Sequence, residues 1–158
     1  MTYESEITAL VHIEVVHDDP DAAAAFMEDV FGAERAEPEF ARFCQGYNED
    51  SGARVVHVRA GNTVFQFIRP SGSGSWRDQL DLTGPGVHNI TVEVSNLEGA
   101  REQMLARGCR ELLSFSADFR AAGYESDAGA TGYAIDASAQ IGMRLEMVPV
   151  ETRYEPGR

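Results

Sequence analysis

Leu10–Gly32 reads LVHIEVVHDDPDAAAAFMEDVFG, and Val87–Gly108 reads VHNITVEVSNLEGAREQMLARG. The second stretch repeats the first: at an offset of 77 residues, His12 falls on Asn89 and Val15 falls on Val92. A second pair of segments, TVFQF at 63–67 and MRLEM at 143–147, repeats at an offset of 80. Such a duplication predicts two similar half-domains related by pseudo-symmetry, with a site between them.

Each half reads as a strand, a helix and three further strands, so the pattern predicts an α+β fold built from two βαβββ modules. The modules are expected at residues 7–70 and 87–150, joined by a linker at 71–86, within a single domain spanning 1–158. The duplication predicts eight strands. They are expected to form two four-stranded half-barrels, each with its long helix outside.

Capping residues, glycines and apolar periodicity predict where the helices and strands of each module begin and end. A helix is expected at 21–30, with an N-cap in the DDPD turn and Gly32 as its end, and a second helix at 97–107 after Ser95 or Asn96. We expect the first helix to bury the face made by Ala22, Ala25, Phe26 and Val30. A short helix at 76–82 falls within the linker, and Gly61-Asn62 predicts a hairpin. The remaining strands are expected near 39–47, 54–60, 63–69, 111–115, 132–135 and 142–148, with a loop over a site at 119–130.

The charge of the chain argues against some classes of binding partner. With 13 basic and 26 acidic residues the net charge is −13, which argues against nucleic acid and anionic membrane surfaces. All the basic residues are Arg, so Schiff-base chemistry and a lysine general base are excluded. Two cysteines form no disulfide framework, and no stretch resembles a signal peptide or a membrane span. These features predict a cytoplasmic protein that acts on a small molecule.

The inward face of the first strand of each half carries polar residues. In one half these are His12 and Glu14, and in the other they are Asn89, Thr91 and Glu93. The last strands of the halves offer Gln66 and Glu146 at matching positions. Imidazole, amide and carboxylate groups at symmetric places suit a divalent ion such as Co, Ni, Mn, Zn, Fe or Mg.

The duplicated modules, the GVHNITVEV segment after a Gly-rich linker, TVFQFIRP and the closing GMRLEM together resemble the vicinal oxygen chelate superfamily. The resemblance covers about residues 7–150 and is closest to the glyoxalase and methylmalonyl-CoA epimerase branch. It implies that His12, Gln66 and Glu146 are the first, second and fourth ligands of one metal ion. It also implies a homodimer.

The third ligand position departs from the family pattern. The epimerases place two histidines there, whereas this chain reads GVHNI at 86–90, so Asn89 takes the place of the second. An amide oxygen is a poor substitute for imidazole toward transition metals, so the site is expected to be weak, to prefer a harder ion, or to be empty. Asn89, Thr91 and Glu93 are then expected to bind substrate, and His88 joins them if a local bulge turns it inward.

The proton-transfer residues depart as well. His57 stands where the epimerases carry a strand glutamate that works opposite the fourth-ligand glutamate. Glu14 occupies a place that is usually small in the family, where a buried carboxylate could serve as a base or could pair with Arg59 or Arg144. His57, Glu14 and Glu146 are therefore the candidate catalytic residues.

Two functions remain open at this point. The first is an isomerase, epimerase or lyase that acts on a carbonyl-containing metabolite through an enolate-like intermediate, with or without a metal. The second is a metal-free protein that sequesters a cationic or aromatic compound, as bleomycin-resistance proteins do.

Overall fold

The two sequence repeats fold into matching strand and helix arrangements in the computed structural model, which describes residues 5–35, 53–116 and 131–149. The first repeat gives β1 (Ile7–Val16), α1 (Pro20–Phe31), β2 (Glu34–Arg35), β3 (Arg54–Ala60) and β4 (Thr63–Arg69). After α3 (Ser75–Thr83), the second repeat gives β5 (Gly86–Val94), α4 (Leu97–Ala106), β6 (Arg110–Ser116), β7 (Thr131–Asp136), α5 (Ser138–Ile141) and β8 (Arg144–Pro149). The strand expected at 39–47 and the loop expected at 119–130 lie outside the described residues.

The chain divides into two compact units. We call His12–His88 the first unit, and Met1–Val11 together with Asn89–Arg158 the second unit. The strands follow the hydrogen-bonding order β2-β3-β4-β1-β5-β8-β7-β6, a mixed sheet that does not close on itself. The predicted α+β fold with eight strands is confirmed.

Strand register shows that the duplication extends to individual residue pairs. In the first unit β1 runs parallel to β4 with Glu14 opposite Gln66, and in the second β5 runs parallel to β8 with Thr91 opposite Glu146. These pairs are related by the same offsets of 77 and 80 that relate the sequence segments. Both halves therefore present their polar strand positions in the same way.

The helix N-caps repeat as well. Asp19 accepts a hydrogen bond from the backbone N–H of Ala22, and Asn96 accepts one from Gly99; both caps have φ −133° and ψ 87°. A side-chain oxygen at this position satisfies one of the unpaired N–H groups of the first helical turn. The helix α1 ends at Gly32, whose left-handed φ of 62° favours glycine.

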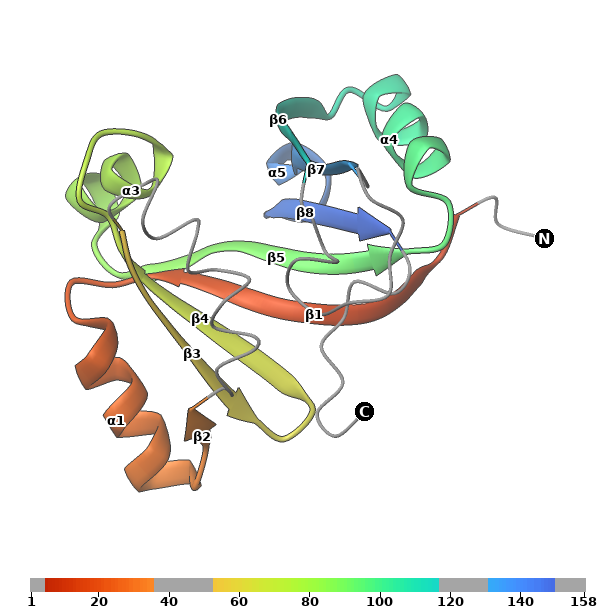
Figure 1. Ribbon diagram of the computed structural model, residues 1–158. Coiled ribbons are helices and arrows are strands. Elements are labelled where there is room, and N and C mark those ends of the chain that lie inside the picture. The colour runs from red at the N-terminus through yellow and green to blue at the C-terminus, as the bar shows by residue number, and fades with distance from the viewer. Residues whose placement is uncertain (1–4, 36–52, 117–130, 150–158) are drawn as a thin grey trace. The chain divides into compact units, whose positions relative to one another are not determined.

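The buried face of α1 differs from the prediction. Ala24 is fully buried and packs with Val56, Val58 and Phe67, while Phe26 and Val30 are 58% and 56% exposed. The Ala-rich helix has apolar residues on more than one side, so its 3.6-residue period did not determine which side is buried. Small side chains let α1 lie close along β3 and β4 (Figure 1).

In the second unit, the apolar face of β5 packs against the helix α4. Val92 and Val94 are buried with Ile135 and Met147, and Leu97, Ala100 and Met104 of α4 pack against them. Ile90 joins the same cluster. Alternation along β5 therefore leaves Asn89, Thr91 and Glu93 on the opposite face.

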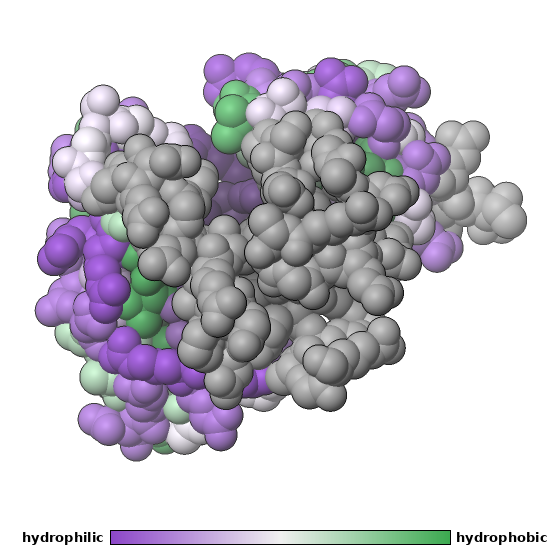
Figure 2. Space-filling model, viewed as in Figure 1, coloured by the Kyte–Doolittle hydropathy of each residue, from purple (hydrophilic) through white to green (hydrophobic). Residues whose placement is uncertain are grey.

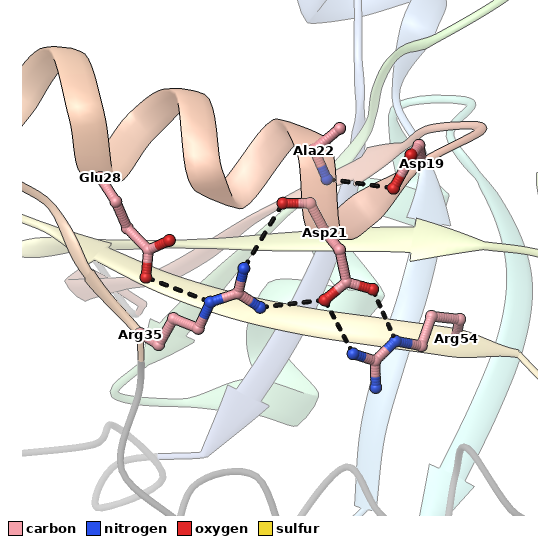
Figure 3. A network of polar contacts seen from close by, with 6 residues as sticks. All are labelled: Asp19, Asp21, Ala22, Glu28, Arg35 and Arg54. Atoms are coloured by element: carbon pink, nitrogen blue, oxygen red, sulfur yellow. Dashed lines mark hydrogen bonds and ion pairs between the residues drawn. The ribbon is translucent and has the colours of Figure 1, made fainter.

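A surface network of ion pairs ties α1 to β2 and β3. Asp21 contacts Arg35 at 3.0 Å and Arg54 at 2.8 Å, and Arg35 also contacts Glu28 at 3.1 Å (Figure 3). Hydrogen bonds from Arg54 and Arg35 lower the pKa of Asp21 below its usual value. A carboxyl with a lowered pKa stabilises the fold at neutral pH, and this stabilisation is lost as the pH falls through the folded-state value.

We expect Asp21→Asn to lower the free energy of unfolding at pH 7 by less than about 1 kcal/mol, because the pairs are half exposed to solvent. Urea unfolding at low salt measures the loss, and added salt should shrink it. Asp29→Asn, which removes the same charge from an exposed position of the same helix, is the matched control. A loss that is unaffected by salt would contradict the electrostatic interpretation.

The visible surface of the described residues is largely hydrophilic, in keeping with the acidic composition (Figure 2). Within the described ranges, no helix is long and apolar enough to span a membrane.

Candidate functional site

The first unit gathers four candidate residues on one face of its sheet. Register places Glu14, Gln66 and His57 side by side on β1, β4 and β3. Directly paired residues on neighbouring strands point to the same face, and residues two apart on one strand do too. His12 therefore shares this face, and all four side chains are buried.

His57 and Gln66 are hydrogen-bonded to each other. The amide Nε2 of Gln66 lies 2.9 Å from Nε2 of His57. Because an amide NH2 donates, the ring nitrogen accepts, and the proton of the neutral imidazole is on Nδ1. Burial, with a smaller contribution from the nearby His12, lowers the pKa of His57 to about 3. A neutral histidine with so low a pKa is a weak base at neutral pH.

His12 is also held in its neutral form. Burial lowers its pKa from 6.5 to about 4. A neutral imidazole is the form that can coordinate a metal ion.

Glu14 has a partner that we did not anticipate. The indole N–H of Trp76, on α3, donates to Oε1 of Glu14 at 2.7 Å. The sequence offered a pairing with Arg59 or Arg144 as the alternative to a catalytic role for this carboxylate, and that pairing stays a prediction. The structure adds a neutral donor from the linker helix. A signal was present, because Trp76 is the chain's single tryptophan and a buried indole N–H usually finds an acceptor.

In the second unit, Glu146 is the central candidate. It lies opposite Thr91 on β5 and Ala134 on β7, and Asn89 donates from Nδ2 to its Oε2 at 3.4 Å. Burial raises the pKa of Glu146 to about 7, against a smaller lowering effect of the Asn89 hydrogen bond. A carboxyl with this pKa can both accept and return a proton at neutral pH.

Thr91 and Glu93, the other candidate residues on β5, are buried. Thr91 is 1% exposed. Glu93 is 4% exposed, and its carboxylate accepts a hydrogen bond from the Thr8 hydroxyl in the same unit. Thr91 and Glu93 share their strand face with Asn89, as the alternation predicted.

His88 is held by α3. Its Nδ1 lies 2.7 Å from Oε1 of Gln79, and its Nε2 lies 3.3 Å from Oγ of Ser75. The amide nitrogen of Gln79 donates to the carbonyls of Gly86 and Val87, so its oxygen faces the ring. Both ring nitrogens of His88 therefore contact the linker helix, and a role for His88 in substrate binding stays a prediction.

Two of the four positions that the resemblance assigns to metal ligands are amides, Gln66 and Asn89. Among residues 5–35, 53–116 and 131–149, no group of three or more His, Cys, Asp or Glu side chains is placed so that it could hold a metal ion. The amide of Gln66 is turned toward His57, and Asn89 donates to Glu146. An amide at the third position fits a transition metal poorly, so we derive no chemical step through a metal.

Comparison with known proteins decides the family. The model of the Glyoxalase/Bleomycin resistance protein/Dioxygenase superfamily matches residues 11–127. The chain belongs to this superfamily. The predicted vicinal oxygen chelate membership is thus confirmed.

Two curated relatives narrow the branch. The chain is 30% identical over 108 residues to an ethylmalonyl-CoA/methylmalonyl-CoA epimerase of Cereibacter sphaeroides, covering 67% of this chain and 75% of the relative. It is also 30% identical over 114 residues to the mitochondrial methylmalonyl-CoA epimerase of Mus musculus, covering 65% of this chain and 55% of that protein. These relatives support the prediction of an enzyme of the epimerase or isomerase class and give no support to a lyase.

Solved structures agree on the fold. The methylmalonyl-CoA epimerase from Mycobacterium tuberculosis superposes with a TM-score of 0.64 at 21% identity, covering 94% of this chain and 92% of that one. A methylmalonyl-CoA epimerase in complex with methylmalonyl-CoA and NH4+ gives a TM-score of 0.65 at 18% identity, covering 95% and 100%. At these identities the likeness extends to the fold alone.

Proposed function

We propose that the chain epimerises the α-carbon of an acyl thioester, with Glu146 as a proton-transfer residue. The observation that carries the proposal is the Glu146 carboxyl on β8, opposite Thr91 and hydrogen-bonded to Asn89, because desolvation raises its pKa to about 7 and so suits it to take a proton at neutral pH. The two curated epimerase relatives support the reaction class.

In the proposed reaction, the α C–H bond breaks and its proton passes to the Glu146 carboxylate. The electron pair remains on the substrate as an enolate of the thioester carbonyl. Return of a proton to the opposite face of the α-carbon inverts the stereocentre. Asn89, which donates to Oε2, holds the carboxylate in place.

We keep Glu14 and His57 of the first unit as the other candidate proton-transfer residues. Glu14 and His57 are both buried there, but His57 is a weak acid–base group at neutral pH because its pKa is about 3. Glu14 is therefore our first choice and His57 our second. Asn89, Thr91 and Glu93 remain the proposed substrate-binding residues.

The experiment that tests the function is solvent exchange. Incubation of methylmalonyl-CoA with the enzyme in D2O should place deuterium on the α-carbon, because an enolate mechanism must exchange that hydrogen. Mass spectrometry measures the incorporation. Tight binding of an unexchanged ligand would instead favour the sequestering protein that shares this superfamily.

We also propose that any divalent ion binds weakly through His12, Gln66 and Glu146, with Asn89 in the place of the third ligand. Asn89→His is expected to raise the metal content of protein purified without chelators, because imidazole binds transition metals better than an amide does. Elemental analysis measures the change, and Asn89→Ala is the control that should leave the content low. Equal metal content in Asn89→His and wild type would contradict the proposed metal site.

The homodimer implied by the resemblance remains a proposal. Light scattering at micromolar concentration tests it, and a monomer would count against it.

A further inference from the structure

A serine, a histidine and a glutamine form a hydrogen-bonded cluster within the first unit, and the proposed proton transfer does not use it. Nε2 of His88, on β5, lies 3.3 Å from Oγ of Ser75, and Nδ1 of His88 lies 2.7 Å from Oε1 of Gln79. Ser75 and Gln79 lie one turn apart on α3. A nucleophile, a base in contact with it and a third group that orients the base form the arrangement that activates a hydroxyl, and its distances are often loose before substrate binds.

The contacts of Gln79 fix the tautomer of His88. The amide nitrogen of Gln79 donates to the carbonyl of Gly86 at 3.3 Å and to that of Val87 at 3.2 Å, so its oxygen accepts from the ring. Nδ1 of the neutral imidazole therefore carries the proton, and Nε2 has the lone pair. The Ser75 hydroxyl is then the donor to Nε2, which is the direction that general-base activation requires.

The serine of this cluster is open to solvent, whereas its base is not. Ser75 is exposed, and His88 is only 8% exposed. The preceding residue, Gly74, has a φ of 127°, and a Cβ added to it would meet no described atom within 4 Å. An acyl group can therefore approach Oγ of Ser75 while the imidazole stays shielded.

Ser75 is also the first residue of α3, and its N-cap residue Gly74 supplies no side-chain acceptor. The N–H groups of a first helical turn carry partial positive charge, which stabilises an oxyanion. The carboxylate of Asp78 lies in the same turn, but it is exposed and its charge is screened by water and salt. This end of α3 therefore favours negative charge on a carbonyl oxygen that Ser75 attacks.

We propose that Ser75, activated by His88 and Gln79, is the nucleophile of a second catalytic site, which hydrolyses acyl thioesters. Gln79 is neutral and stabilises an imidazolium less than a carboxylate would, so the site needs an acyl group with a good leaving group. A thiol, with an ordinary pKa of about 8.5, leaves more readily than an amine or an alcohol.

The reaction has two steps. Oγ of Ser75 attacks the thioester carbonyl carbon as its proton passes to Nε2 of His88, the C–S bond breaks, and the departing thiolate takes that proton. Water then attacks the acyl-serine ester and gives a proton to Nε2. The ester C–O bond breaks, the carboxylic acid is released, and Oγ recovers the proton.

The first test uses S-phenyl thioacetate, a small thioester. We expect wild type to release thiophenol and to carry an acetyl group on Ser75, which peptide mass spectrometry locates. Ser75→Ala and His88→Asn should each release thiophenol at least about a hundredfold more slowly, because one lacks the nucleophile and the other lacks the base. Ser73→Ala, at an exposed serine of the same linker, is the matched control and should keep the wild-type rate. Circular dichroism checks that each variant is folded.

The second test measures activation at this position without a substrate. A thiol beside a histidine has a lowered pKa, so Ser75→Cys should react with iodoacetamide at pH 6.5 at least about tenfold faster than Ser73→Cys. Adding His88→Asn to Ser75→Cys should abolish that difference. Peptide mass spectrometry separates the new cysteine from Cys44 and Cys109.

Acetylation at residues other than Ser75, or equal thiophenol release by Ser75→Ala and wild type, would overturn the proposed second site. Equal alkylation of Ser75→Cys and Ser73→Cys would overturn the activation by His88 and would leave the cluster as an anchor of α3. Neither result bears on the proposed epimerase, which is tested separately by α-deuterium exchange.

Discussion

Glu146→Gln is expected to reduce α-deuterium exchange by at least about a hundredfold, because an amide cannot accept the substrate proton. The effect should fall on kcat more than on KM, since proton removal is needed only in the transition state. Glu102→Gln, which makes the same change at an exposed position of α4, is the matched control. Full exchange in Glu146→Gln would show that another residue is the base.

The same variant should also change stability. The pKa of Glu146 is about 7 in the folded protein against 4.5 for the ordinary value, so the folded state binds more protons between these pH values. Stability therefore falls as the pH rises from 4.5 to 7, by up to about 3 kcal/mol. Glu146→Gln removes this dependence and should stabilise the protein at pH 8 but not at pH 4. A variant that is less active and more stable would identify the residue as functional rather than structural.

The second large effect concerns acid stability of the first unit. The pKa of His57 is about 3 in the folded protein and 6.5 in its ordinary form, so the unfolded chain binds more protons between these pH values. The stability that comes from keeping this ring neutral is fully present above pH 6.5 and is lost as the pH falls toward 3. Over the whole range the loss reaches about 5 kcal/mol, and about 3 kcal/mol of it falls above pH 4.

His57→Asn should remove that slope, since an amide does not titrate and its oxygen can accept from Gln66. Urea unfolding at pH 7, 5 and 4, with chelator present, measures the difference between variant and wild type at each pH. His17→Asn, at the partly exposed residue that follows β1, controls for the loss of one histidine. A difference that is constant with pH would contradict the burial of a neutral His57.

The sequence by itself determined the architecture, because the strands, helices and turns follow from short-range patterns that occur twice along the chain. Strand alternation identified the inward positions of His12 and Asn89, and the offset between the repeats placed Asn89 over His12 and Glu146 over Gln66. Caps, hairpin and helix ends were predictable because each depends on residues within one turn of the chain.

Tertiary structure decided the rest, since it depends on what packs against each face. The buried side of α1 follows from the sheet beneath it, because an Ala-rich helix offers more than one apolar side. The Trp76–Glu14 hydrogen bond joins residues 62 positions apart, a distance at which no local pattern selects a partner. The low pKa of His57 and the raised pKa of Glu146 both arise from burial, which depends on how much water the folded chain excludes from each group.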